Sequence, residues 1–155
     1  TGWRIGYTAS SPEIAKIMSN VQSHATSNPN SIAQKAAEAA ISGPQDMVAT
    51  MVEAFASRRD YMVQRINSIP GLSCVKPNGA FYVMMNISQL LGKELAGRKI
   101  QSSDDFADIL LEKANVALVP GSGFGIDTHV RLSYATSQET ITKGLDRIEQ
   151  FLKQG

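Results

Sequence analysis

The sequence predicts an α/β (α+β) fold in which a small two-layer sandwich, a β-sheet covered by helices, is preceded by a long connecting helix. Residues 73–152 alternate short apolar runs with amphipathic segments in the order β-β-α-β-β-α, which favours a small sheet with helices on one face. Residues 45–69 form the longest stretch of helical periodicity. A chain of 155 residues is also long enough for one core, burying about 70% of its unfolded surface.

The first elements are a strand and a helix. Residues 3–9 form a short apolar run that predicts a strand. Ser11, Pro12 and Glu13 then supply an N-cap, a first-turn proline and a first-turn acid, which together start a helix. Residues 28–30 (NPN) end this helix. Its apolar side carries Ile14, Ile17, Met18 and Val21.

Two further helices follow. An alanine-rich segment from about residue 31 to 41 predicts a helix that residues 42–44 (SGP) stop. The segment 45–69 predicts a long helix that connects two domains, and Pro70 and Gly71 end it. Its apolar stripe consists of Met47, Met51, Phe55, Met62 and Ile66.

The last part of the chain predicts the sandwich itself. Strands are expected at residues 73–76, 80–87, 116–119 (short and buried) and 130–135. Helices are expected from Ser102 to about Ala114 and from Ser137 to the end. The final helix directs Ile141, Leu145, Ile148, Phe151 and Leu152 inward. The charged loop at residues 91–102 is expected to be mobile.

Composition excludes several classes of partner. Lys and Arg number 15 against 14 Asp and Glu, and a net charge of +1 gives no polybasic footprint for nucleic acid or anionic lipid. The longest apolar runs are too short to span a membrane. The single cysteine, Cys74, cannot form an internal disulfide and fits a buried structural thiol in a reducing, cytoplasmic compartment.

Two arginines are the strongest functional signal. Arg4 and Arg131 are each the lone cation in a short apolar run, residues 1–7 (TGWRIGY) and 129–134 (HVRLSY). An unpaired guanidinium there is costly to desolvate unless an anion meets it, so two anion sites are expected. The alternative is that each arginine reaches solvent or pairs with an internal carboxylate.

Other candidate motifs have weaker functional interpretations. The glycine-rich residues 121–125 (GSGFG) lead to another strand and not into a helix, so they predict a tight turn and not a phosphate-binding loop. Tyr82 is expected to pack near the cleft. His24 and His129 lack the spacing of metal ligands, and no metal site is expected.

The ordered motifs resemble one enzyme family. Residues 1–7, 26–34 (TSNPNSIAQ), 77–82 (PNGAFY), 119–125 (VPGSGFG) and 129–134 are similar, in the same order, to segments of class I aminotransferases. These are the fold-type I pyridoxal-phosphate enzymes typified by aspartate aminotransferase. The resemblance implies that the family's cofactor-binding lysine lies a few residues before residue 1. The chain is therefore expected to be the C-terminal portion of a larger enzyme.

The resemblance also implies roles and boundaries. Arg4 matches the arginine that grips the phosphate of pyridoxal 5'-phosphate, and Arg131 matches the arginine that holds the substrate's α-carboxylate. No catalytic residue is expected in this chain, and Lys16, Lys35 and Lys76 are expected on the surface. Residues 1–30 are expected to be a remnant of the large cofactor-binding domain, 31–69 a helical connector and 70–155 the small C-terminal domain.

The implied activity is amino-group transfer from aspartate or a similar amino acid to a 2-oxo acid, by a cytoplasmic homodimer in its full-length form. Ser27 and Asn28 match a region that touches the active site across the dimer interface, although a helix-capping Asx turn explains them equally. Two alternatives remain open. One is a pyridoxal-phosphate lyase or synthase on the same scaffold, and the other is a non-catalytic binding or interaction module.

Overall fold

The computed structural model describes residues 2–154 and divides into two compact units, one up to Val48 and one from Ala49 onward. Helix α3 (Asp46–Ser68) begins in the first unit and continues in the second. Among the described residues, no helix is both long and apolar enough to cross a membrane.

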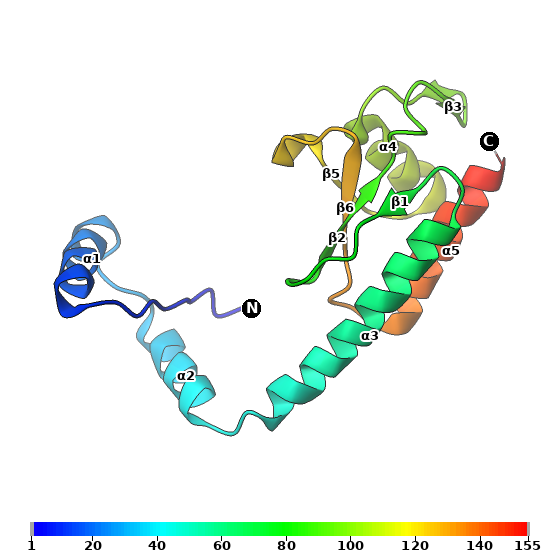
Figure 1. Cartoon of the computed structure of the whole chain (residues 1–155). Coiled ribbons are helices and arrows are strands. Elements are labelled where there is room, and N and C mark those ends of the chain that lie inside the picture. The colour runs from blue at the N-terminus through cyan, green and yellow to red at the C-terminus, as the bar shows by residue number, and fades with distance from the viewer. Residues whose placement is uncertain (1, 155) are drawn as a thin grey trace. The chain divides into compact units, whose positions relative to one another are not determined.

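The first unit contains two complete helices, α1 (Pro12–Ala25) and α2 (Ser31–Ser42), as predicted (Figure 1). Pro12 occupies the first turn of α1, where its missing N–H costs nothing. Asn30 caps α2, because its Oδ1 accepts hydrogen bonds from the N–H groups of Ile32 at 2.9 Å and Ala33 at 3.2 Å. The predicted strand at residues 3–9 is wrong, since these residues are irregular and no described strand pairs with them.

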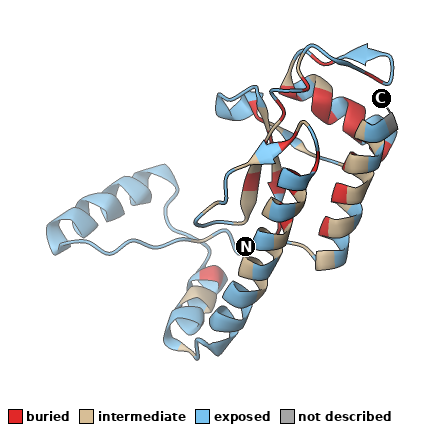
Figure 2. Ribbon diagram, turned by 45° about the vertical axis from the view of Figure 1, so that its right-hand side comes forward, coloured by how far each residue is buried: buried red, intermediate tan, exposed pale blue. Residues whose placement is uncertain are grey.

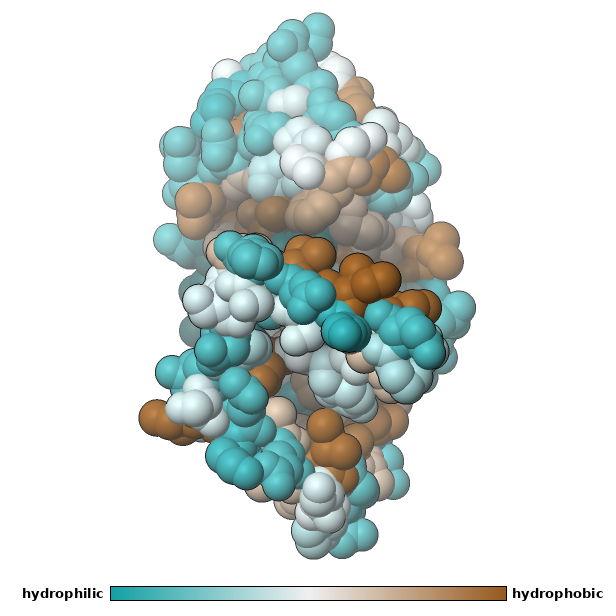
Figure 3. All heavy atoms as spheres, turned by 90° about the vertical axis from the view of Figure 1, so that its left-hand side faces the viewer, coloured by the Kyte–Doolittle hydropathy of each residue, from teal (hydrophilic) through white to brown (hydrophobic). Residues whose placement is uncertain are grey.

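Most of the first unit is exposed. Figure 2 shows it almost entirely in the colour of exposed residues. The predicted apolar side of α1 exists but is uncovered: Ile17 and Val21 are 63% and 64% exposed. Figure 3 turns this unit toward the viewer and shows brown side chains gathered along one side of the front helix. Trp3 and Tyr7 add to the exposed apolar surface of this unit.

The second unit contains a four-stranded antiparallel sheet in the order β1-β2-β6-β5 (Figure 1). The strands are β1 (Ser73–Cys74), β2 (Tyr82–Asn86), β5 (Val119–Pro120) and β6 (His129–Ser133). Met84 of β2 and Val119 of β5 both pair with Arg131 of β6. The register therefore places Arg131 in the middle of the sheet.

One face of this sheet forms the core. Val83, Met85 and Val130 are fully buried and Leu132 nearly so, whereas the alternate residues of β2 and β6 are not. They pack with buried side chains of α3, of α4 (Ser103–Ile109) and of α5 (Gln138–Gln154). The predicted sandwich of a small sheet and helices is confirmed.

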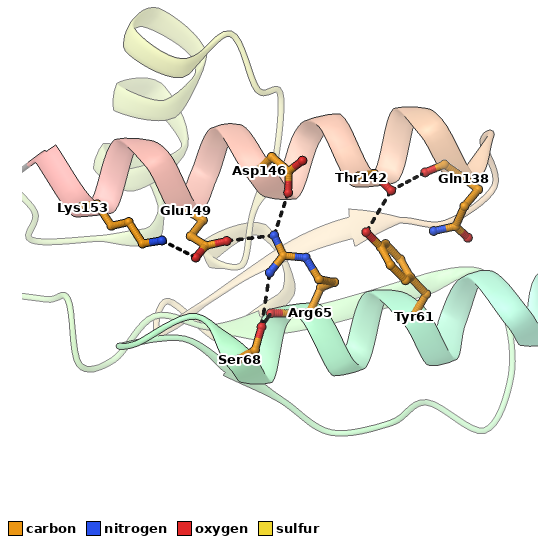
Figure 4. A network of polar contacts seen from close by, with 8 residues as sticks. All are labelled: Tyr61, Arg65, Ser68, Gln138, Thr142, Asp146, Glu149 and Lys153. Atoms are coloured by element: carbon orange, nitrogen blue, oxygen red, sulfur yellow. Dashed lines mark hydrogen bonds and ion pairs between the residues drawn. The ribbon is translucent and has the colours of Figure 1, made fainter.

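Hydrogen bonds and ion pairs join α3 and α5 (Figure 4). Arg65 of α3 donates to Asp146 at 2.7 Å and to Glu149 at 2.9 Å on α5. One helical turn before Arg65, the hydroxyl of Tyr61 on α3 accepts a hydrogen bond from the hydroxyl of Thr142 on α5 at 2.9 Å. These contacts fix the two helices side by side above the apolar contacts that Ile66 and Ile148 make in the core.

Several boundaries differ from the prediction. The buried strand expected at residues 116–119 is wrong: only Val119–Pro120 is a strand, and Val119 is 41% exposed. The helix expected to reach Ala114 ends as an α-helix at Ile109 and continues as a π-helical turn, Leu110–Ala114. Within residues 91–102 lies a hairpin of β3 (Glu94–Leu95) and β4 (Arg98–Lys99). Leu95 and Ile100 are buried in the core and hold this loop on the domain.

Candidate functional site

Arg131 lies on the open face of the sheet, opposite the core. Its neighbours in β6, Val130 and Leu132, point to the buried face, whereas Arg131 is half-buried on the other side. Two aromatic rings contact its guanidinium: the centroid of Tyr82 lies 4.2 Å from Cζ and that of Phe124 lies 4.6 Å away. Both distances are within the range of cation–π attraction.

A cleft of about 520 Å³ opens beside Arg131. It is lined by β6, by the segment 115–119 and by α5. Lys143 and Arg147 of α5 also line it, and none of its described lining residues carries a carboxylate. Among residues 2–154, no carboxylate forms an ion pair with Arg131, so the internal pairing considered for this arginine is not observed. The cleft therefore has the charge of an anion site.

The glycine loop forms a tight turn after β5, as predicted. Ser122–Phe124 is a single 3-10 turn, and the chain continues into β6 and not into a helix. A Cβ at Gly121 would overlap the backbone oxygens of Ile126 and His129, which is why only glycine fits there. Gly125 adopts a positive φ of 77° at the end of the turn.

A buried hydroxyl network holds this turn, and the sequence analysis missed it. Ser103 is fully buried at the start of α4 and donates from Oγ to Asp127 Oδ1 at 2.6 Å and from its backbone N–H at 2.9 Å. Ser103 Oγ accepts from the N–H of Ser122 at 3.1 Å. The side-chain and backbone hydrogen bonds from Ser103 hold the pKa of Asp127 below its ordinary value.

In the sequence around Ser103, only the preceding residue, Ser102, had a recognisable pattern. Ser102 has the N-cap pattern, and its Oγ does accept a hydrogen bond from the N–H of Asp105 at 3.1 Å. Nothing in the spacing distinguished Ser103 from a second surface serine. Its partner Asp127 is 24 residues away, beyond the reach of any local motif.

Arg4 lines a separate groove within the first unit. This groove, about 640 Å³, is formed by residues 3–7 and by small side chains of α2, including Ala36 and Ala40. Arg4 is exposed and has a positive φ of 50°, an uncommon conformation for a non-glycine residue. The guanidinium of Arg4 is a planar fork of five donors, a geometry that matches the oxygens of a phosphate group.

The two arginines belong to different units. Ser27 has a positive φ of 65°, and the N–H of Asn28 donates to the carbonyl of Thr26 at 2.9 Å. The capping explanation was wrong about Asn28, because Asn30 supplies the cap of α2.

The remaining candidates have structural explanations. His129 Nδ1 contacts Thr128 Oγ1 at 2.9 Å, and the described residues contain no cluster of His, Cys, Asp or Glu that could hold a metal ion. Cys74 is half-buried, and burial raises the pKa of its thiol, which disfavours a nucleophilic role. The predicted surface positions of Lys16, Lys35 and Lys76 are confirmed, since all three are exposed.

Comparison with known proteins extends the resemblance to nearly the whole chain. The family model of class I and II aminotransferases matches residues 1–148. An aspartate aminotransferase of Geobacillus stearothermophilus is 49% identical over 153 residues, covering 99% of this chain and 38% of the relative. An aspartate/prephenate aminotransferase of Cereibacter sphaeroides is 48% identical over 152 residues, covering 97% of this chain and 38% of the relative.

The solved structures agree. The crystal structure of the aspartate aminotransferase from Rhizobium meliloti superposes with a TM-score of 0.88 at 45% identity, over 98% of this chain and 38% of that one. The chain thus spans well under half the length of the proteins that it matches. The chain belongs to the class I and II aminotransferase family.

Proposed function

We propose that the whole protein containing this chain is a pyridoxal-phosphate-dependent aminotransferase that moves an amino group from aspartate, or a similar amino acid, to a 2-oxo acid. The relatives named aspartate aminotransferase support this substrate class. The observation that carries the proposal is Arg131, half-buried on the open face of the sheet beside a cationic cleft without a carboxylate.

Arg131 would bind the α-carboxylate that every amino-acid and 2-oxo-acid substrate carries. A guanidinium meets a carboxylate through two parallel N–H···O bonds, which fixes direction as well as position. A carboxylate held in this way restricts rotation about the bond to Cα and therefore sets the direction of the Cα–H bond. Substrate binding and orientation are thus the work of this chain's second unit.

Members of this family use pyridoxal 5'-phosphate, and we assign its phosphate group to the guanidinium of Arg4. When bound, the cofactor supplies a conjugated ring that delocalises the electron pair left at Cα. Arg4 would hold the phosphate group. It lies within residues 1–30, which we assign to the large cofactor-binding domain. Residues 31–69 would form the connector and residues 70–155 the small domain.

No residue of this chain is proposed as the catalytic base. Lys16, Lys35 and Lys76 are exposed, and Lys35 and Lys76 are paired with Glu38 at 2.7 Å and Asp60 at 2.8 Å. We therefore expect the 155-residue chain alone to show no transamination and no new visible absorption with added pyridoxal phosphate. Specific turnover by the purified chain would show that a lysine within it does the chemistry.

We also propose a cytoplasmic homodimer for the whole protein. The support for a further protein surface is the uncovered apolar side of α1, together with Trp3 and Tyr7. The support for a reducing compartment is a single, half-buried cysteine that cannot form a disulfide within the chain.

The decisive experiment compares two conservative substitutions in the whole protein. Arg131→Lys keeps the charge and loses the bidentate fork, so kcat/KM for aspartate should fall by about two orders of magnitude, on the order of 3 kcal/mol, with cofactor absorption unchanged. Arg98→Lys is the control and should change little, because Arg98 does not line the cleft and pairs with Glu112 at 3.3 Å.

The products separate the remaining alternatives. An aminotransferase yields one new amino acid and one new 2-oxo acid in equal amounts, whereas a lyase or synthase on the same scaffold does not. A binding module yields neither. An Arg131→Lys protein with unchanged catalytic efficiency would show that another group holds the carboxylate.

A further inference from the structure

Two aromatic residues contact the Arg131 guanidinium without using its hydrogen-bond donors. The rings of Tyr82 and Phe124 lie within 4.6 Å of Cζ, and among the described residues no hydrogen bond to this side chain is found. A phenyl ring attracts a guanidinium through its negative face and accepts no conventional hydrogen bond. The N–H donors therefore stay available to an anion while the rings limit the positions of the side chain.

The two rings are held by different parts of the fold. Tyr82 pairs with Ser133 across β2 and β6, which makes it the diagonal neighbour of Arg131 on the same face of the sheet. Phe124 comes from the 3-10 turn after β5. Its side chain is 51% exposed, so core packing does not explain its position.

The hydroxyl network explains what holds Phe124. Ser122, at the start of its turn, donates from its N–H to Ser103 Oγ, and Ser103 in turn donates twice to Asp127. Ser103 is fully buried in the first turn of α4, which belongs to the core. Hydrogen bonds to Ser103 of α4 thus hold the turn on both sides of Phe124, through Ser122 before it and Asp127 after it.

We propose that Tyr82 and Phe124 are positioning residues for Arg131, and that the Ser103–Asp127 pair sets the position of Phe124. The inference rests on the proposed function, because it concerns the orientation in which Arg131 meets a substrate carboxylate. A long arginine side chain loses rotamer freedom when it is fixed in one position, and this loss opposes binding. Because the two rings already restrict the Arg131 side chain before a carboxylate binds, less rotamer entropy is lost on binding.

The test uses the whole protein loaded with its cofactor, and maleate, a four-carbon dicarboxylate, as the probe. Phe124→Leu and Tyr82→Leu should each weaken maleate binding roughly threefold to tenfold. Both should raise KM for the amino acid more than they lower kcat. Phe124→Tyr keeps the ring and should bind maleate like the parent protein, whereas Asp127→Asn should give a smaller loss in the same direction. Phe151→Leu, a partly buried ring on α5, is the control and should leave maleate binding unchanged.

A double-substitution cycle decides whether the rings act through Arg131. In an Arg131→Lys background, Phe124→Leu should cause no further loss of maleate affinity. If Arg131→Lys weakens binding but both leucine variants bind maleate like the parent, the positioning role is wrong and the proposed function stands. If Arg131→Lys itself leaves maleate binding unchanged, the carboxylate role of Arg131 fails, and the positioning role fails with it. An equal loss from Phe124→Leu in both backgrounds would show that the ring acts elsewhere.

Discussion

The helices α1 and α5 carry the same kind of pattern and have different surroundings. Each has apolar residues on one side, at helical spacing. In α5, Ile141, Leu145 and Ile148 are buried in the core of the second unit. In α1, Ile17 and Val21 lie exposed. Periodicity thus identifies where a helix forms and which side is apolar, but burial requires a partner surface that the pattern does not contain.

The largest expected effect tests this difference directly. Ile148→Ala should lower the free energy of unfolding of the 155-residue chain by about 2–5 kcal/mol, because it removes fully buried methyl groups and leaves a cavity. The same change at Ile17, which is largely exposed, should alter it by no more than about 0.5 kcal/mol. Urea unfolding followed by circular dichroism measures both. A comparable loss at Ile17 would mean that α1 is covered in solution.

A second prediction concerns the glycine loop of the second unit. Gly121→Ala should destabilise the chain by about 1–3 kcal/mol or more, because the added methyl overlaps two backbone oxygens. Gly123→Ala is the matched control, since nothing lies within 4 Å of its Cβ position. Thermal unfolding of the two variants side by side checks the pair. Equal melting temperatures would contradict the close approach of the backbone at Gly121.

A smaller effect is expected at the α3–α5 contact. Hydrogen bonds from Lys153 and Arg65 hold the pKa of Glu149 below its ordinary value of 4.5. A carboxyl with a lowered folded-state pKa contributes stability above pH 4.5 and loses it as pH falls through the folded value. Unfolding free energies measured from pH 6 to pH 3 should therefore fall less steeply for Glu149→Gln than for the parent chain. Identical slopes would exclude this contribution.

Much of the fold followed from local patterns. Pro12 and the Asn30 region marked helix starts, Pro70 and Gly71 marked the end of the long helix, and alternation in residues 80–87 marked a strand. Each of these signals acts within a few residues, so a single sequence contains it. The two arginines were also visible, because a lone cation in an apolar run is unusual without a partner.

The errors involve partners that are distant in sequence. Residues 3–9 look like a strand, yet a strand exists only with a hydrogen-bonded neighbour, and the described residues supply none. The buried Ser103 was indistinguishable from a surface serine until Asp127 came beside it. The hairpin at Glu94–Lys99 was missed in the predicted charged loop, because its charges outweighed Leu95 and Ile100, which pack in the core.

We propose that the two units contribute one arginine each to two different anions, a cofactor phosphate at Arg4 and a substrate carboxylate at Arg131. The most direct test measures both affinities in the whole protein for Arg4→Lys and Arg131→Lys. Arg4→Lys should weaken pyridoxal phosphate binding at least tenfold, on the order of 1.4 kcal/mol or more, and leave the maleate affinity of the loaded protein nearly unchanged. Arg131→Lys should do the reverse. Loss of the same affinity in both variants, or of neither, would contradict the assignment of two separate anions.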